Sequence, residues 1–198
     1  MFWEKEIECA KPAELRSLQD KRFREMLARM SRTEFFKQSV TTGIDPDTAT
    51  LDDLPRLFFT FKKDLRDYYP FGLLTCDPAE LIEVHSSSGT TGKPTVVSYT
   101  RGDIKVWKRA MARAMTAASV TREDTVQNAY GYGLFTGGLG FHYGCEEIGA
   151  AVIPVSGGRT DFQIMIAGDL GSTVLCCTPS FALYLANEAE QIGRSLKK

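Results

Sequence analysis

The tract Ser86–Thr95 holds the densest group of residues that could do chemistry in this 198-residue chain. It reads Ser-Ser-Ser-Gly-Thr-Thr-Gly-Lys-Pro-Thr and so combines hydroxyl side chains, two glycines and one lysine. Glycine lets backbone N–H groups turn toward an anion, hydroxyls donate further hydrogen bonds, and lysine adds a positive point charge. The tract therefore predicts a phosphate-binding loop. Its candidate ligands for phosphate are Ser86, Ser87, Ser88, Gly89, Thr90, Thr91, Gly92 and Lys93.

The spacing within this tract excludes a Walker A motif. That motif has four residues between its first glycine and Gly-Lys, followed by Ser or Thr and a helix. Here only Thr90 and Thr91 separate the glycines, and Pro94 follows the lysine. The β-branched run that comes next predicts a strand, so we expect the tract to join two strands as a hairpin. The alternative is an ordinary Ser/Gly-rich surface hairpin without a ligand.

A second candidate site is the aromatic and glycine-rich segment Tyr130–Gly138, which follows a predicted strand. Ligands of parallel sheets bind outside the carboxyl ends of the strands. Aromatic side chains there could form flat apolar walls, or they could simply pack the sheet against its helices. The later segment Ser156–Arg159 also follows a strand, and we interpret it as a turn into the next helix. Thr178 with Pro179 is typical of a helix start.

The elements that must position these residues change character near residue 80. Residues 1–80 predict a helical segment, with a helix from Pro12 through Met30 and a short helix restarted by a capping box of Ser31 with Glu34. Residues 81–198 predict an α/β subdomain, because β-branched runs alternate with helix-length amphipathic stretches. The predicted strands are near Leu81–His85, Thr95–Tyr99, Thr125–Ala129, Ala150–Pro154 and Thr173–Cys177, and the helices between them are near Gly102–Ala118, Gly140–Ile148, Thr160–Ala167 and Ser180–Gln191. The fold class is therefore α/β, a helical N-terminal segment followed by a largely parallel βαβ sheet.

Composition excludes several classes of function. The net charge of -1 gives no electrostatic reason to bind nucleic acid or an anionic membrane. No run of eighteen apolar residues occurs, and the charged start Met1–Glu6 is unlike a signal peptide. Five cysteines without a C-x-x-C pair favour buried reduced thiols in a cytoplasmic protein and predict no metal site. His142 lacks partners at metal-ligand spacing, so we expect a hydrogen-bonded structural role.

Several motifs together resemble one family. The tract Ser86–Thr95 is similar to the phosphate-binding loop of the adenylate-forming superfamily, and further segments resemble its phenylacetate–CoA ligase branch. These segments are Met1–Trp3, Lys63–Arg66, Tyr69–Gly72, Tyr130–Gly138 and Val155–Gly158. The resemblance implies an AMP-forming ligase that uses ATP, Mg²⁺ and coenzyme A, with Tyr130, Tyr132 and Phe135 as candidates for the pocket that holds an arylacetic acid.

The resemblance also implies that part of the family's machinery is missing. The motifs that would hold Mg²⁺ and the ribose, and the lysine that activates the carboxylate, have no counterpart before Lys198. We therefore expect the N-terminal part of such a ligase, an incomplete domain that is inactive alone. Two alternatives stay open: part of an enzyme that adenylates another acid, or a binding or oligomerisation module without catalysis. An exposed sheet edge would favour a homo-oligomer.

Overall fold

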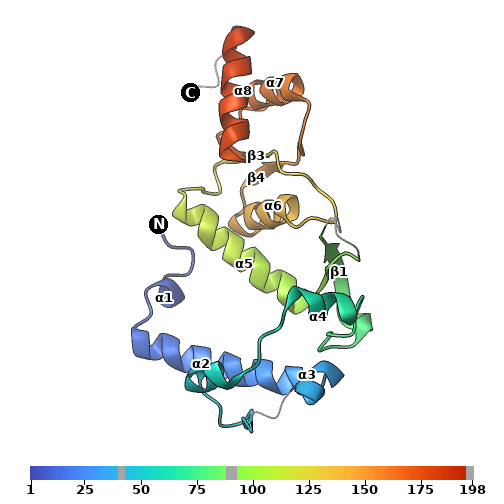
Figure 1. Ribbon diagram of the computed structural model, residues 1–198. Coiled ribbons are helices and arrows are strands. Elements are labelled where there is room, and N and C mark those ends of the chain that lie inside the picture. The colour runs from blue at the N-terminus through green and yellow to red at the C-terminus, as the bar shows by residue number, and fades with distance from the viewer. Residues whose placement is uncertain (40–42, 88–92, 195–198) are drawn as a thin grey trace. The chain divides into compact units, whose positions relative to one another are not determined.

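The computed structural model describes residues 1–39, 43–87 and 93–194, which form two compact units. One unit is Glu4–Arg101, and the other combines Met1–Trp3 with the chain from Gly102 onward. Contacts thus group the hairpin with the preceding helices, whereas the secondary-structure pattern of the sequence changes near residue 80. Figure 1 shows the elements of both units, which are taken in turn below.

The first unit begins with helices. They are α1 (Lys5–Glu8), α2 (Pro12–Met30), α3 (Glu34–Ser39), the 3₁₀ turn η1 (Leu51–Arg56), α4 (Lys62–Asp67) and the 3₁₀ turn η2 (Pro78–Glu80). Phe23 and Leu27 of α2 are buried against Phe36 and Ala49 in a small core. The helix predicted from Pro12 to Met30 is confirmed.

The predicted capping box on Ser31 is wrong. Because α2 continues through Met30, Ser31 is the C-terminal cap of that helix. The Ser31 hydroxyl donates to the Ala28 carbonyl oxygen at 3.0 Å. The hydroxyl of Thr33 instead accepts a hydrogen bond from the Phe36 backbone N–H at 3.2 Å. Thr33 therefore takes the capping role two residues further along the chain.

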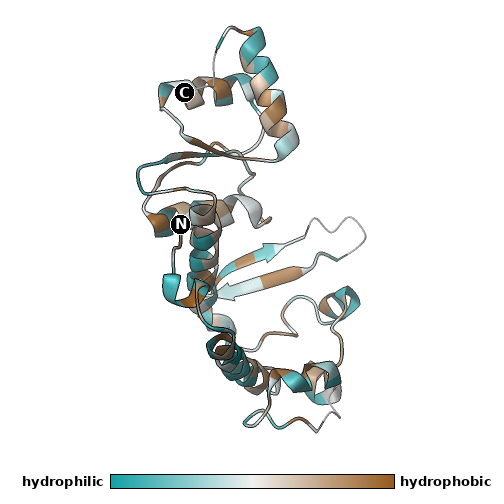
Figure 2. Cartoon of the chain, turned by 90° about the vertical axis from the view of Figure 1, so that its left-hand side faces the viewer, coloured by the Kyte–Doolittle hydropathy of each residue, from teal (hydrophilic) through white to brown (hydrophobic). Residues whose placement is uncertain are grey.

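A hairpin completes this unit. Strands β1 (Leu81–Ser86) and β2 (Val96–Thr100) pair antiparallel, with His85 opposite Val97 and a register shift between Leu81 and Glu83. Figure 2 shows both strands in profile with apolar stretches on each. The strand–loop–strand arrangement predicted around the phosphate loop is confirmed.

The second unit is an α/β sandwich. Its sheet contains β3 (Thr125–Asn128), β4 (Ala151–Ile153) and β5 (Val174–Cys176), all parallel and in the order β4-β3-β5. Its helices are α5 (Arg101–Ala117), α6 (Gly137–Ile148), α7 (Thr160–Asp169) and α8 (Pro179–Gln191). The parallel βαβ fold expected from the alternating pattern is confirmed, and α6 begins at Gly137, earlier than the predicted Gly140.

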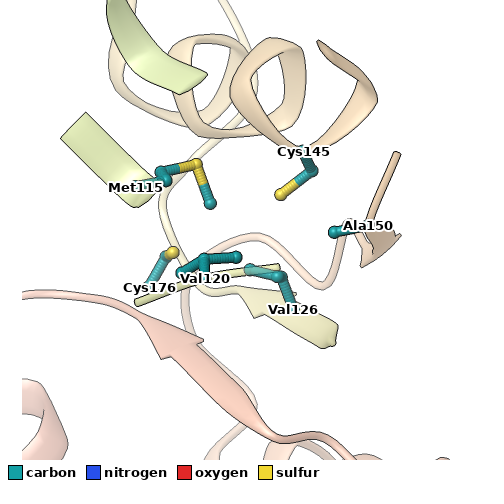
Figure 3. Close-up of a cluster of buried hydrophobic side chains, with 6 residues drawn as sticks. All are labelled: Met115, Val120, Val126, Cys145, Ala150 and Cys176. Carbon is teal, nitrogen blue, oxygen red and sulfur yellow. The ribbon is translucent and has the colours of Figure 1, made fainter. Parts of the chain in front are cut away.

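Two helix layers cover the two faces of this sheet, as Figure 1 shows for α5 and α6 on one face and α7 and α8 on the other. The main core lies under α5 and α6 (Figure 3), and its buried residues are Met115, Val120, Val126, Cys145, Ala150 and Cys176. On the other face, Ile164 of α7 packs with Leu185 and Ala189 of α8. Within the described ranges, no helix is both long and apolar enough to cross a membrane.

Candidate ligand-binding site

The hairpin of the first unit closes the base of the predicted phosphate loop. The Ser87 backbone N–H donates to the Thr95 carbonyl oxygen at 2.9 Å, and the Thr95 N–H donates to the Ser87 hydroxyl oxygen at 3.0 Å. These bonds continue the ladder one step beyond β1 and β2. Since the Ser87 oxygen accepts here, its own proton is left to donate elsewhere.

Three of the eight predicted phosphate ligands are described. Ser86 ends β1, Ser87 forms the closing bonds, and Lys93 is exposed with its ammonium nitrogen 5.5 Å from the centre of the Tyr69 ring. The other five, residues 88–92, lie outside the described residues. The described part of the loop therefore presents one exposed cation and two hydroxyl groups at the end of the hairpin where the loop connects the two strands.

His85 anchors the strand that leads into this loop. Its ring is buried, its Nε2 atom lies 2.5 Å from a carboxylate oxygen of Glu83, and it meets the Tyr99 ring edge-on at 5.7 Å. Residues two apart on a strand point to the same face, so Glu83 and His85 share one side of the hairpin. These polar and aromatic contacts hold the end of β1 in place next to the loop.

The candidate ligand-binding position of the second unit is the carboxyl end of β3. From β3 the chain passes to α6 on one face of the sheet, whereas from neighbouring β4 it passes to α7 on the opposite face. The loops after these two strands therefore diverge, which is the topological switch point where open parallel sheets bind ligands. We name residues 129–136 the aromatic loop and residues 154–159 the glycine loop.

Asn128, the last residue of β3, organises the aromatic loop. Its fully buried side-chain amide donates to the hydroxyl oxygen of Tyr132 at 2.8 Å and to the carbonyl oxygen of Gly138 at 2.7 Å. Its side-chain oxygen accepts from the Tyr130 backbone N–H at 3.2 Å. One side chain thus ties both ends and the middle of the loop to the sheet.

The three aromatic residues predicted to line a pocket occupy different environments. Tyr130 stacks on Phe141 with ring centres 5.0 Å apart and packs against the main core. Tyr132 is half-buried and hydrogen-bonded, whereas Phe135 is 71% exposed. The structure therefore brings Tyr130 and Tyr132 to one loop base and leaves Phe135 reaching outward from the same loop.

A chain of polar contacts extends from Tyr132 along α6. The Tyr132 hydroxyl lies 3.2 Å from Nδ1 of His142, whose Nε2 lies 3.5 Å from Glu146, and Glu146 pairs with Lys108 at 2.6 Å. Burial raises the pKa of the Tyr132 phenol, and the hydrogen bond from Lys108 lowers the pKa of Glu146. The hydrogen bonding expected for His142 is present, and its structural role stays a prediction.

The glycine loop is held from the opposite face of the sheet. The side-chain amide of Gln163, a fully buried residue of α7, donates to the carbonyl oxygens of Ser156 at 3.0 Å and Gly158 at 2.8 Å. Ser156 and Arg159 adopt left-handed backbone conformations, with φ of 66° and 50°. Non-glycine residues rarely do so, and such positions gather at functional sites. The segment leads into α7 as the turn interpretation expects, but it is a strained and specifically fastened turn.

The two loops are also linked to each other. The Ser156 backbone N–H donates to the Asn128 carbonyl oxygen at 3.1 Å, and the Tyr132 N–H donates to the Ser156 hydroxyl oxygen at 3.4 Å. Beside the glycine loop, a shallow hollow is lined by Arg159, Thr160, Asp161, Phe162, Tyr184 and Glu188. The predicted pocket residues do not line this hollow.

Sequence reasoning overlooked the amides that hold this site. Asn128 and Gln163 carry no motif of their own, because their importance comes from burial and from the loops that they reach. Two consecutive amide residues in a short strand were the available signal, since β3 reads Thr125, Val126, Gln127 and Asn128. Among the described residues, no group of three acidic, histidine or cysteine side chains gathers as a metal site.

No protein-family model matches the chain. The chain is 46% identical over 198 residues to phenylacetate–coenzyme A ligase of Thermus thermophilus, covering 98% of this chain and 44% of that protein. The ligase of the same name from Pseudomonas putida is 49% identical over 152 residues, covering 76% of this chain and 35% of that protein. That of Escherichia coli is 44% identical over 191 residues, covering 94% of this chain and 44% of that protein.

Solved structures agree with these sequence relatives. A crystal structure of 2-hydroxyisobutyryl-CoA ligase in complex with 2-HIB-AMP and CoA matches with a TM-score of 0.87 and 25% identity, covering 98% of this chain and 43% of that chain. The same ligase in its postadenylation state matches with a TM-score of 0.83 and 25% identity, covering 93% and 41%. The resemblance predicted from the sequence is confirmed, and the chain spans less than half the length of the relatives that it matches.

Proposed function

Because the chain is a relative of the phenylacetate–CoA ligases along nearly its whole length, we propose that it supplies the nucleotide- and acid-binding part of an AMP-forming aryl-acid–CoA ligase. The observation that carries this proposal is 44–49% identity to four such ligases. The strand–loop–strand hairpin and the switch-point loops support it, because they provide separate places for phosphates and for an acid.

The reaction of such a ligase has two steps. A carboxylate oxygen of the acid attacks the α-phosphorus of ATP, the bond to the β-phosphate breaks, and pyrophosphate leaves the acyl adenylate. The thiol of coenzyme A then attacks the acyl carbonyl carbon and loses its proton, and AMP leaves the thioester. The first step depends mainly on positioning and on neutralising phosphate charge.

The hairpin is the proposed phosphate site. The hydroxyl groups of Ser86 and Ser87 and the ammonium group of Lys93 would contact the β- and γ-phosphates, together with residues 88–92. Mg²⁺, when bound with the nucleotide, would neutralise part of the phosphate charge. Its protein ligand and most of the coenzyme A site would come from the remainder of the enzyme, since this chain matches less than half of each relative.

The aromatic loop is the proposed acid site. Tyr132 and Phe135 would line it, with Tyr130 as the packed base beneath them. An aromatic wall favours an aryl group, and phenylacetate is the acid named for four relatives. A 2-hydroxyisobutyryl-CoA ligase shares the fold at 25% identity, so a small hydroxy acid is the competing substrate.

Calorimetry on the chain tests the binding half of this proposal. We expect binding of MgATP, and binding of phenylacetate in preference to 2-hydroxyisobutyrate and phenylalanine. Preference for the amino acid would place the chain with another kind of adenylating enzyme. Absence of both nucleotide and acid binding at millimolar ligand would instead favour a module without catalysis.

Complementation tests the catalytic half. The part of the Thermus thermophilus relative that follows the matched region is added in trans, and AMP release is measured with phenylacetate, MgATP and coenzyme A. We expect AMP only when both parts are present, and its loss when the Lys93→Met variant replaces the wild-type chain. Equal AMP release by the Lys93→Met variant and the wild-type chain would contradict the proposed phosphate site.

A further inference from the structure

Gln127 and Asn128 are consecutive buried amides in the central strand β3. A buried amide costs free energy unless its donors and acceptors are paired, so two in succession on a core strand call for specific partners. Successive residues of a strand point to opposite faces of the sheet. The two side chains therefore reach different layers, and each finds partners that lead to a different loop of the switch point.

Asn128 reaches the α6 side and fastens the aromatic loop. Its three side-chain hydrogen bonds, to Tyr130, Tyr132 and Gly138, are all between 2.7 and 3.2 Å. The Tyr132 hydroxyl then contacts His142 at 3.2 Å. The Tyr132 hydroxyl thus lies within hydrogen-bond distance of both the Asn128 amide and the His142 ring, and these two partners hold the phenol ring in one orientation.

Gln127 reaches the α7 side and fastens the glycine loop through a second amide. Its side-chain nitrogen donates to the Gln163 backbone oxygen at 3.1 Å and side-chain oxygen at 3.3 Å, and its own oxygen accepts from the Ser172 hydroxyl at 3.1 Å. With its oxygen satisfied in this way, Gln163 directs its nitrogen to the carbonyl oxygens of Ser156 and Gly158. Of the three residues of this loop with left-handed φ, Ser156 and Gly158 carry the fastened carbonyl oxygens and Arg159 follows directly after them.

We propose that Gln127 and Asn128 form an amide pair that divides the positioning of the two switch-point loops, with Asn128 fastening the aromatic loop and Gln127, through Gln163, fastening the glycine loop. Both are positioning residues, because they act on the acid through the loops and do not contact it. The consequence for acid binding rests on the proposed function, whereas the division of labour between the two amides rests on the hydrogen bonds alone.

The test uses isosteric variants and a readout for each loop. Asn128→Asp removes the donors to Tyr132 and Gly138, and Gln163→Glu removes the donors to the glycine loop. Backbone amide hydrogen exchange then follows the two loops separately in the ligand-free chain. We expect Asn128→Asp to speed exchange in the aromatic loop by about three- to tenfold, which corresponds to the loss of one to two net hydrogen bonds. The glycine loop, which is joined to the aromatic loop through Ser156, should change much less. Gln163→Glu should do the reverse.

Milder variants keep the test decisive if a buried carboxylate prevents folding. Tyr132→Phe removes only the hydroxyl between Asn128 and His142, and Ser172→Ala removes only the outer partner of Gln127. The ring ¹⁵N shifts of His142 give a second readout, since the chain has only two histidines and His85→Asn assigns them. Tyr132→Phe should shift the Nδ1 signal of His142, and Ser172→Ala should leave it in place.

Two results would overturn the proposal. One is equal acceleration in both loops and in the sheet core, which indicates a general loss of stability. The other applies if the wild-type chain binds phenylacetate: variants whose loops exchange faster but whose phenylacetate affinity equals that of the wild type would contradict the proposal. If the wild-type chain binds no acid, the proposed function fails, and the exchange pattern still decides whether the amide pair divides the loops.

Discussion

Lys93 rests on Tyr69, with its ammonium nitrogen 5.5 Å from the ring centre. Such a contact at an exposed position stabilises by about 0.5–1 kcal/mol. A charge-assisted hydrogen bond to phosphate is stronger, about 1.5–3 kcal/mol. Under the proposed function, Lys93 would therefore leave the ring to bind phosphate, and the contact with Tyr69 would hold it near the loop in the absence of nucleotide.

The first prediction concerns this pair. Lys93→Met should weaken MgATP binding by roughly tenfold or more, because it removes the one described cation of the loop, and should change stability by less than about 1 kcal/mol. Tyr69→Leu, the matched control, keeps the cation and should alter ATP affinity by less than about fivefold, in line with the size of the ring contact. Calorimetric titration of both variants measures this, and equal losses would contradict the assignment.

A second prediction separates two glycines of the aromatic segment. A Cβ atom on Gly138 would lie 2.5 Å from the carbonyl oxygen of Gly131, whereas one on Gly131 would meet nothing within 4 Å. Gly138→Ala should therefore destabilise the chain by about 1–3 kcal/mol, as overpacking does, and Gly131→Ala should have little effect. Urea unfolding followed by circular dichroism compares them. Similar urea midpoints for the two variants would contradict the close contact between Gly131 and Gly138.

A third prediction distinguishes packing from ligand contact among the aromatic residues. Tyr130→Ala removes a partly buried ring that stacks on Phe141 and packs against the core, and it should cost about 1–3 kcal/mol of stability. Phe135→Ala removes an exposed ring and should leave stability within about 0.5 kcal/mol. If Phe135 lines the acid site, its loss should weaken phenylacetate binding without weakening ATP binding. Unchanged acid affinity would remove Phe135 from the proposed site.

A fourth prediction concerns the cysteines. Burial raises the pKa of the Cys145 thiol to about 11 and that of Cys176 to about 12. Both thiols therefore stay protonated at pH 8 and should react with Ellman's reagent far more slowly than exposed Cys9. Labelling of native and urea-unfolded chain, with Cys9→Ser as the control, measures this. Rapid labelling of all sites in the native chain would contradict the buried core.

The same thiols set a direction for stability at alkaline pH. Well below the ordinary thiol pKa of 9.0 they are protonated in both the folded and the unfolded chain and contribute no pH dependence. Between pH 9 and about 11 to 12 the unfolded chain loses these protons and the folded chain keeps them. The folded state then binds more protons, so its stability should fall as pH rises through this window. Cys145→Ala should flatten part of that slope in urea midpoints measured between pH 8 and 11.

The hairpin illustrates what pattern reading could reach. Pro94 and the β-branched residues after it exclude a helix, so the strand–loop–strand form follows from local chemistry alone. The helix start at Thr178 is equally local, because the Phe181 N–H donates to the Thr178 hydroxyl oxygen at 3.4 Å. The cap near Ser31 failed for the opposite reason, since the length of the preceding helix decides which of several hydroxyls serves as a cap.

The sequence by itself determined the α/β class and the strand–loop–strand form around the candidate phosphate loop, because strand and helix periods and turn residues are local signals. Its motifs carried the resemblance to the family. Tertiary structure alone decided that Tyr130 is core and Phe135 exposed, and that Gln127 and Asn128 hold two different loops. The order β4-β3-β5 brings those loops together and sends them to opposite faces. Which loop each buried amide contacts depends on that strand order and on the alternation of side chains along β3. The sequence spacing between an amide and its partners does not reveal this pairing.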